Sequence, residues 1–166
     1  MSSRTQTVTA TSLPAYLNDH RGAAKVAIDM VTRLAREQDG TPLGDVLGRL
    51  AKEIDQDRAT LADLMARLGI RPHPTKQAVG WVAEKLARVR FSPRLTGNVE
   101  TSRLMQLESL SLGIEGKRLL WRSLVPLAGA DPRLADVDLD HLQRRAEAQR
   151  EWLEPYRLEA AAAGLG

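Results

Sequence analysis

The chain of 166 residues contains no cysteine, which excludes disulfide scaffolds, thiol nucleophiles, cysteine-ligated zinc and iron–sulfur clusters. Aromatic residues are scarce, at 4% of the sequence, so the core is predicted to be aliphatic. No run approaches the roughly 18 unbroken apolar residues of a membrane span. The first dozen residues lack the basic and apolar regions of a secretory signal. We therefore expect a soluble, cytoplasmic domain.

The charge balance and the common catalytic motifs indicate no particular chemistry. The 24 basic and 21 acidic residues leave a net charge of +3, too small a surplus to indicate nucleic-acid binding by itself. The sequence has no glycine-rich phosphate loop, no Gly-x-Ser-x-Gly elbow and no Ser–His–Asp cluster. Arginine far outnumbers lysine, which hints at a GC-rich bacterial genome.

Apolar residues recur at spacings of three and four along most of the chain, and no alternating strand pattern competes with this helical period. After a flexible tail at 1–12, one helical domain is predicted at 13–163, with long helices at 14–38, 42–68, 99–128 and 133–162. Pro14 and Pro42 are expected in first turns, Pro126 is expected to end or bend the third helix, and Pro155 to kink or interrupt the fourth. The connection between the first two helices is only a few residues long, so these helices are expected to form an antiparallel hairpin.

The link between the two helix pairs, residues 69–98, is long for a turn. It encloses one short amphipathic helix, whose apolar residues are Val79, Val82, Leu86 and Val89. A long link between two helix pairs is what a bundle with a crossover connection needs. The sequence therefore predicts an all-α four-helix bundle with a crossover between its second and third helices.

Polar residues fall on three of the apolar stripes: His20 in the first helix, Asp57 in the second and Gln149 in the fourth. A buried unpaired carboxylate is costly, so Asp57 needs a partner such as His20 or an arginine. Stripe assignment is precise only to about one position, so Glu53 or Gln56 is an alternative inward-facing residue.

Local segments resemble the ferritin-like superfamily. Leu17-Asn18-Asp19-His20 looks like the first-helix segment that carries a ligand carboxylate in bacterioferritins, and Glu53-Ile54-Asp55-Gln56 looks like the Glu-x-x-His turn of the second helix. Residues 145–154 look like the corresponding turn of the fourth helix, and 110–124 are similar to the third helix of small bacterial ferritin-like proteins of unknown function. The resemblance covers about 13–160 and implies a ferritin-like bundle with the long crossover.

The resemblance also implies a di-iron site, and here the sequence departs from the family pattern. Such a centre takes a Glu from each of two helices and Glu-x-x-His from each of the other two. This chain reads Glu53-x-x-Gln56 and Ala146-x-x-Gln149, so both histidines are replaced. Glutamine offers a neutral oxygen, a poor substitute for imidazole around iron. We therefore expect a degenerate di-iron site, no cofactor and no catalysis.

A divergent metal site is the alternative interpretation, in an oxidoreductase or iron handler that uses iron or manganese. Its metal ligands would be His20, Glu53, Asp57 and Glu115. The wider set, either vestigial ligands or a buried polar cluster, is Asp19, His20, Glu53, Gln56, Asp57, Glu108, Glu115 and Gln149. For His20 we favour a core histidine hydrogen-bonded to Asp57 or Glu53.

In the third predicted helix, the sequence does not decide which polar residue faces the core beside Asp57 and Gln149. Glu108 and Glu115 lie seven residues apart and therefore on one face, with Lys117 and Arg118 near the apolar stripe. Either glutamate could serve as a metal ligand, but such pairs more often form ion pairs with Arg or Lys on a neighbouring helix. A buried polar ladder of this kind would specify helix register rather than perform chemistry.

Two further patterns have a simple structural explanation. Asp136-x-Asp138-x-Asp140-His141 begins like a calcium loop but lacks its glycine and terminal glutamate, so we favour a helix N-terminus, where acidic residues complement the dipole. The crossover carries a basic group that is a candidate nucleic-acid or membrane surface: Lys76, Lys85, Arg88, Arg90 and Arg94. Its short apolar stripe is more simply a cap on the bundle, which makes a nucleic-acid partner the less favoured interpretation.

Glycines inside the predicted helices, Gly22, Gly113 and Gly116, cost helix stability and suggest close helix approach within the bundle or across a dimer. The sequence therefore favours a small non-catalytic helical protein that acts as a structural or interaction module and forms a homodimer. Sequence alone does not name a further protein partner.

Overall fold

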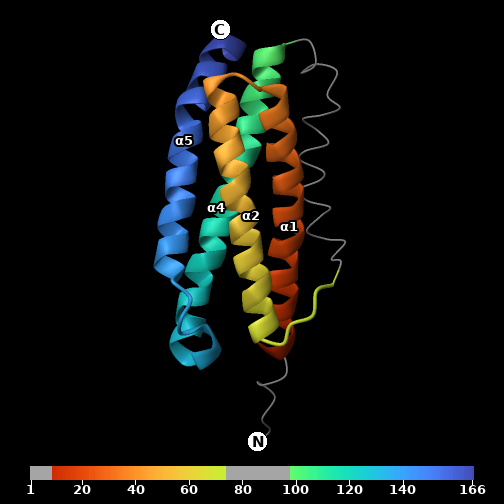
Figure 1. Cartoon of the computed structure of the whole chain (residues 1–166), viewed down its shortest axis with the longest axis vertical. Coiled ribbons are helices and arrows are strands. Elements are labelled where there is room, and N and C mark those ends of the chain that lie inside the picture. The colour runs from red at the N-terminus through yellow and green to blue at the C-terminus, as the bar shows by residue number, and fades with distance from the viewer. Residues whose placement is uncertain (1–8, 74–97) are drawn as a thin grey trace, which may run out of the picture.

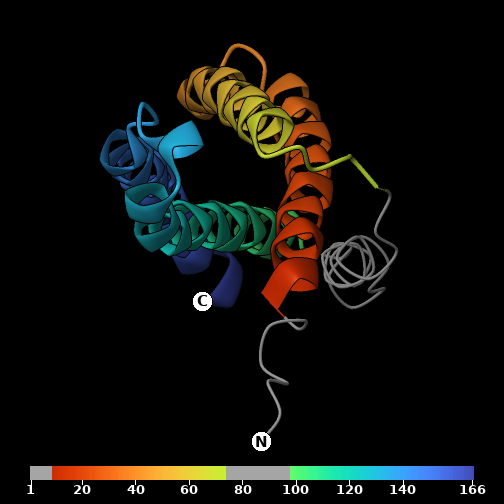
Figure 2. The ribbon, with the colours of Figure 1, turned by 90° about the horizontal axis from the view of Figure 1, so that it is seen from below.

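The structure is a computed structural model, and it describes residues 9–73 and 98–166. Within these two ranges the chain is helical and contains no β-strand. The long helices are α1 (Thr9–Glu37), α2 (Pro42–Arg67), α4 (Val99–Ala130) and α5 (Leu139–Leu165), and a 3₁₀ turn, Pro132–Leu134, precedes α5. Figures 1 and 2 show these four helices side by side around one long axis. The prediction of an all-α protein with four long helices is confirmed.

The helices form two hairpins, α1 with α2 and α4 with α5 (Figure 1). In the second hairpin, Thr101 near the start of α4 donates to the carbonyl oxygen of Gly164 near the end of α5, at 2.9 Å. Further along α4, Lys117 donates to Gln149 of α5, so the two helices are antiparallel. The colours of Figure 1 show that α2 and α4 run in the same direction. The chain therefore leaves α2 at one end of the bundle and enters α4 at the other.

Local chemistry sets the helix starts. Thr41 caps α2, because its hydroxyl oxygen accepts from the backbone N–H of Gly44 at 3.1 Å. Asn98 caps α4 in the same way, with its side-chain oxygen 2.9 Å from the N–H of Glu100. In the α1–α2 turn, Gly40 has a φ of +74°, a left-handed conformation that glycine adopts without a Cβ penalty.

Three helix limits differ from the expected ones, and each difference involves proline. α1 begins at Thr9 rather than at 14, so residues 9–12 of the expected tail are helical and Pro14 lies inside the helix. α4 continues through Pro126 to Ala130, and α5 continues through Pro155 to Leu165. Both of these prolines are exposed, as are the residues four positions earlier whose carbonyls lose a hydrogen bond. Water can therefore satisfy those carbonyls, and the helices need not end there.

The fourth helix starts later than the expected residue 133, at Leu139. Asp131 caps only the short 3₁₀ turn, and a second cap follows at Asp138, whose carboxylate accepts from the N–H of His141 at 2.8 Å. The acidic segment 136–141 is thus a helix start, as we favoured over a calcium loop. The short helix expected in the crossover lies outside the described residues.

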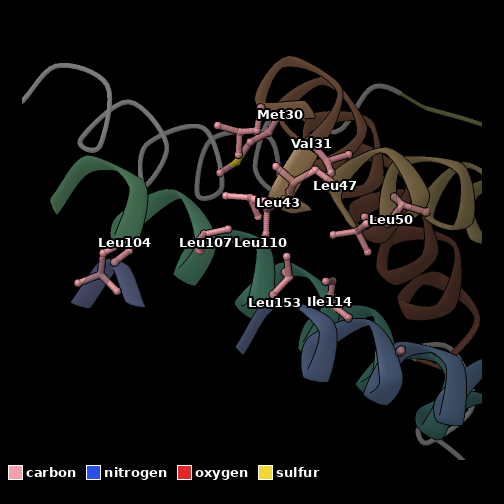
Figure 3. Packing of buried hydrophobic residues seen from close by; sticks show 14 residues of the cluster. Met30, Val31, Leu43, Leu47, Leu50, Leu104, Leu107, Leu110, Ile114 and Leu153 are labelled. Atoms are coloured by element: carbon pink, nitrogen blue, oxygen red, sulfur yellow. The ribbon is translucent and has the colours of Figure 1, made fainter. Parts of the chain in front are cut away.

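The buried side chains form two aliphatic clusters stacked along the bundle. One joins the end of α1 to the start of α4 and includes Val31, Leu47, Leu107 and Leu153 (Figure 3). The other lies toward the opposite end and includes Trp121, which is 1% exposed. On α2, α4 and α5 the apolar stripe passes from one cluster to the other through polar residues. These polar residues are the candidate site.

Candidate functional site

The polar layer, as we call Glu53, Asp57, Lys117, Arg145 and Gln149, crosses the interior between the two apolar clusters. Asp57 of α2 is its centre, with only 3% of its side chain exposed. One carboxylate oxygen of Asp57 pairs with the ammonium group of Lys117 on α4, and the other pairs with the guanidinium group of Arg145 on α5. Asp57 therefore has the arginine partner that its burial requires, together with a lysine.

Hydrogen bonds extend the layer beyond Asp57. Lys117 also donates to the Oε1 atom of Gln149 at 2.5 Å, and Gln149 is fully buried. The Nε2 atom of Gln149 in turn donates to Glu53 at 3.0 Å. The amide thus uses both of its ends, which fixes its orientation. Two carboxylates and two cations balance each other within this layer.

The environment of Lys117 opposes its charge. Burial lowers the pKa of Lys117 below its ordinary value of 10.5, although the neighbouring Asp57 carboxylate acts in the opposite direction and raises it. Arg145 adds a repulsive charge nearby, which lowers the pKa further. The direct contacts of Lys117 with Asp57 and Gln149 favour the ammonium form against this effect of burial.

Lys117 contacts Asp57 and Gln149, two members of the set that we named as vestigial ligands or a buried polar cluster. Asp57 directly follows the second-helix segment compared above with a Glu-x-x-His turn, and Gln149 lies in the corresponding segment of α5. A dication between them would have to displace a buried ammonium group and would face Arg145 as well. Among the residues that the structure describes, no three His, Asp or Glu side chains come together as a metal site.

His20 does not join the polar layer, contrary to the hydrogen bond that we expected with Asp57 or Glu53. In the described parts of the chain those carboxylates bind Lys117, Arg145 and Gln149 instead. The imidazole of His20 packs edge-on against the ring of Tyr16, with 4.7 Å between ring centroids. Burial lowers the pKa of His20 below its ordinary 6.5, and the charge of its neighbour Asp19 partly offsets this. The physical reason is charge: two cations on α4 and α5 satisfy Asp57 better than a neutral imidazole.

Glu108 and Glu115 of α4 form ion pairs with arginines of the neighbouring helix α5, as we expected from the more common interpretation of such pairs. Glu115 of α4 contacts Arg118 on its own helix and Arg150 of α5, each at 2.7 Å. The hydrogen bond from Arg118 is the main cause that holds the pKa of Glu115 below its ordinary value. Glu108 lies 3.5 Å from Arg157 of α5. Both glutamates therefore tie α4 to α5 at the surface.

The other predicted residues separate into described and undescribed ones. Gln56 is exposed and accepts a hydrogen bond from Arg145 at 3.4 Å, so it lies at the rim of the layer. Asp19 is half-buried beside His20 on α1. The basic group of the crossover, Lys76, Lys85, Arg88, Arg90 and Arg94, lies outside the described residues.

Sequence reasoning missed Asn18, which is 2% exposed. Its Nδ2 atom donates to the carbonyl oxygens of Pro14 and Arg71, and its Oδ1 atom accepts from the N–H of His73 at 2.7 Å. This one side chain holds the segment after α2 against α1. The only signal in the sequence was its place beside Leu17 in the first apolar stripe.

A pocket of about 280 Å³ opens between α1, α2 and α4, next to the polar layer. Small residues of α1 and α4, such as Ala24, Ala27 and Gly116, line it together with larger apolar side chains. Asp57 and Lys117 form part of its wall, and Trp121 lines it as well. Among the described residues the indole N–H of Trp121 has no hydrogen-bond acceptor.

No helix in the described ranges is long and apolar enough to cross a membrane. No protein-family model matches this chain, and neither a curated protein nor a solved structure matches it significantly.

Proposed function

We propose that this protein is a non-catalytic, ferritin-like helical bundle that acts as a structural and self-associating interaction module. In this proposal the polar layer replaces a di-iron centre and sets the register of the helices. The observation that carries it is the Lys117 ammonium group, which links Asp57 of α2 to Gln149 of α5. A buried ammonium group at this point repels a metal ion, and the layer needs no cofactor to complete it.

Metal content tests the first half of the proposal. Protein purified without chelator is loaded with iron(II) or manganese(II), desalted, and measured by inductively coupled plasma mass spectrometry beside Asp57→Asn and His20→Ala. We expect background metal in all three. Near-stoichiometric metal in the wild type that disappears in either variant would overturn the proposal and favour the divergent metalloprotein.

An exposed apolar face on α4 supports the self-association. Leu112 is 58% exposed and Leu119 is 46% exposed. With Gly116 between them, they follow the spacing of one helix face. A Cβ atom added at Gly116 would meet nothing within 4 Å in the described chain, so the close approach expected at this glycine is not made there. A second copy packed on this face would bury both leucines and use the missing side chain.

Light scattering after size exclusion measures the self-association directly. We expect the wild type at twice the chain mass of 18.3 kDa and Leu119→Glu at the monomer mass. Leu158→Glu is the matched control, because Leu158 is similarly exposed, at 53%, but lies on α5 rather than on α4. A monomeric wild type, or an equal effect of the two substitutions, would contradict the dimer.

A further inference from the structure

The helix α4 is apolar on two sides rather than one. Its inner side carries the buried residues Leu107, Ile114 and Trp121. On its outer side, large apolar residues alternate with small residues at spacings of three and four, which gives a repeat of seven. We call this second set the outer seam: Met105, Ser109, Leu112, Gly116, Leu119 and Ser123. A helix that is apolar on opposite sides is normally buried on both.

The exposed side of α2 provides a comparison within the same bundle. It carries charged residues such as Arg49, Lys52 and Asp63, as is typical of a helix side that faces water. The outer side of α4 instead leaves Leu112 and Leu119 exposed. Figure 2 shows α4 with α5 on one side and α1 on the other, so the outer seam faces away from the bundle. This side of α4 therefore has the chemistry of an interface.

The order of large and small residues makes the outer seam complementary to itself when it is reversed. Reversal about the point midway between Leu112 and Gly116 brings each large residue opposite a small residue of a second copy: Leu112 opposite Gly116, Leu119 opposite Ser109, and Met105 opposite Ser123. A parallel pair would place each leucine against its own copy and each small residue against a small one, which leaves gaps. The hydroxyl of Ser109 already donates to the carbonyl oxygen of Met105 at 2.8 Å, so burial leaves this donor satisfied.

Charges beside the outer seam favour the same arrangement. Glu108, Glu115 and Arg122 follow one another at intervals of seven residues. The same reversal brings Glu108 of each copy close to Arg122 of the other. Glu108 is 45% exposed, and Arg122 is exposed and has no ion-pair partner within the described ranges. Glu115 would come near its own copy, but its charge is already balanced by Arg118 and Arg150.

We propose that two copies of this chain pack α4 against α4 in antiparallel orientation along the outer seam, with the two-fold axis midway between Leu112 and Gly116. This inference rests on the proposed self-association and specifies its partner surface, orientation and register. Ser109, Leu112 and Gly116 also line the pocket of about 280 Å³ beside the polar layer, so the second copy also covers apolar surface at the α4 side of that pocket.

Disulfide cross-linking tests the orientation and register, because the chain contains no cysteine of its own. The double variant Met105→Cys with Ser123→Cys places one thiol at each end of the outer seam. On a single helix these positions are about 27 Å apart at 1.5 Å per residue, whereas a disulfide needs Cα atoms within about 7 Å. In the proposed dimer each thiol lies opposite the other thiol of the second copy. Mild oxidation should therefore convert most of the double variant into a covalent dimer.

The two single variants are the matched controls. Each of them places its thiol about 27 Å from the same thiol of the second copy, so neither should cross-link alone. An equal mixture of the two should form linked heterodimers. Cross-linking of either single variant as readily as the double variant would overturn the antiparallel register.

Light scattering separates this failure from a failure of the proposed function. A wild type that is dimeric while the double variant does not cross-link would refute only the antiparallel arrangement. A monomeric wild type would refute the self-association and the arrangement together.

A charge exchange tests the pairing independently, with the dimer dissociation constant measured by sedimentation equilibrium at low salt. Arg122→Glu places like charges opposite each other at two symmetric positions and should weaken the dimer about three- to thirtyfold. Adding Glu108→Arg restores opposite charges and should recover the wild-type constant to within about threefold. The control Lys52→Glu makes the same change of charge at an exposed position of α2 and should have no effect. A double exchange that dimerises no better than Arg122→Glu would refute the pairing.

Discussion

Replacement of Lys117 by methionine is the most direct test of the polar layer. The substitution keeps the length and apolar stem of the side chain but removes the ammonium group. Asp57 then keeps only Arg145, and the Oε1 atom of Gln149 loses its donor. Because the side chains of Asp57 and Lys117 are only 3% and 14% exposed, water replaces these contacts poorly.

The expected destabilisation follows from these losses. Breaking a buried ion pair from one side costs about 3–5 kcal/mol when the remaining charge has no partner. Arg145 still contacts Asp57, which reduces this contribution to about 2 kcal/mol, and the unpaired Gln149 oxygen adds about 1 kcal/mol. We therefore expect a loss of about 3 kcal/mol, which lowers the Tm of a domain of this size by about 6–12 °C.

Urea unfolding followed by circular dichroism at pH 7 measures this loss. The matched control is Arg58→Met on α2, where Arg58 pairs with Asp55 at 2.7 Å but both side chains are about half exposed. An exposed pair contributes only about 0–1 kcal/mol. The double variant Asp57→Asn with Lys117→Met completes a cycle, in which we expect a coupling energy above about 1 kcal/mol. If Lys117→Met costs no more than Arg58→Met, the layer does not stabilise the bundle and the reasoning fails.

Three further predictions concern pH and a missed residue. Burial lowers the pKa of Lys117, so just below pH 10.5 the unfolded chain binds more protons than the folded chain. The stability difference between wild type and Lys117→Met should therefore grow from pH 7 to 10.5. Urea titrations in which this difference shrinks would refute the prediction. Because the pKa of His20 is lowered in the folded state, stability is lost as the pH falls below 6.5. In thermal melts from pH 7 to 5, His20→Phe should lose less stability than the wild type. The exposed control His141→Gln should lose as much as the wild type. Asn18→Ala removes three hydrogen bonds and should cost about 1–3 kcal/mol by urea unfolding, with faster hydrogen exchange at the N–H of His73; unchanged exchange would contradict its role.

Much of the fold was predictable because helical periodicity is a local property. The α2 stripe that runs from Leu43 through Asp57 to Leu64 is buried as expected, and Gln149 is buried on α5. Helix-start signals are local as well, which is why Pro42 and the acidic segment before His141 could be recognised as helix starts. The helix limits near Pro14 and Pro155 could not, because proline ends a helix only when packing and solvent leave the freed carbonyl unsatisfied.

The sequence by itself determined that four amphipathic helices form and that Asp57 and Gln149 face inward, since a period of 3.6 residues assigns each side chain to a face of its own helix. Only the tertiary structure decided which groups meet across the helices. Three cations or donors were available to Asp57, and the relative shift of α2, α4 and α5 selected Lys117 and Arg145 over His20. The pocket also arises only in three dimensions, because alanines of α1 and glycines of α4 leave space only when those helices face each other.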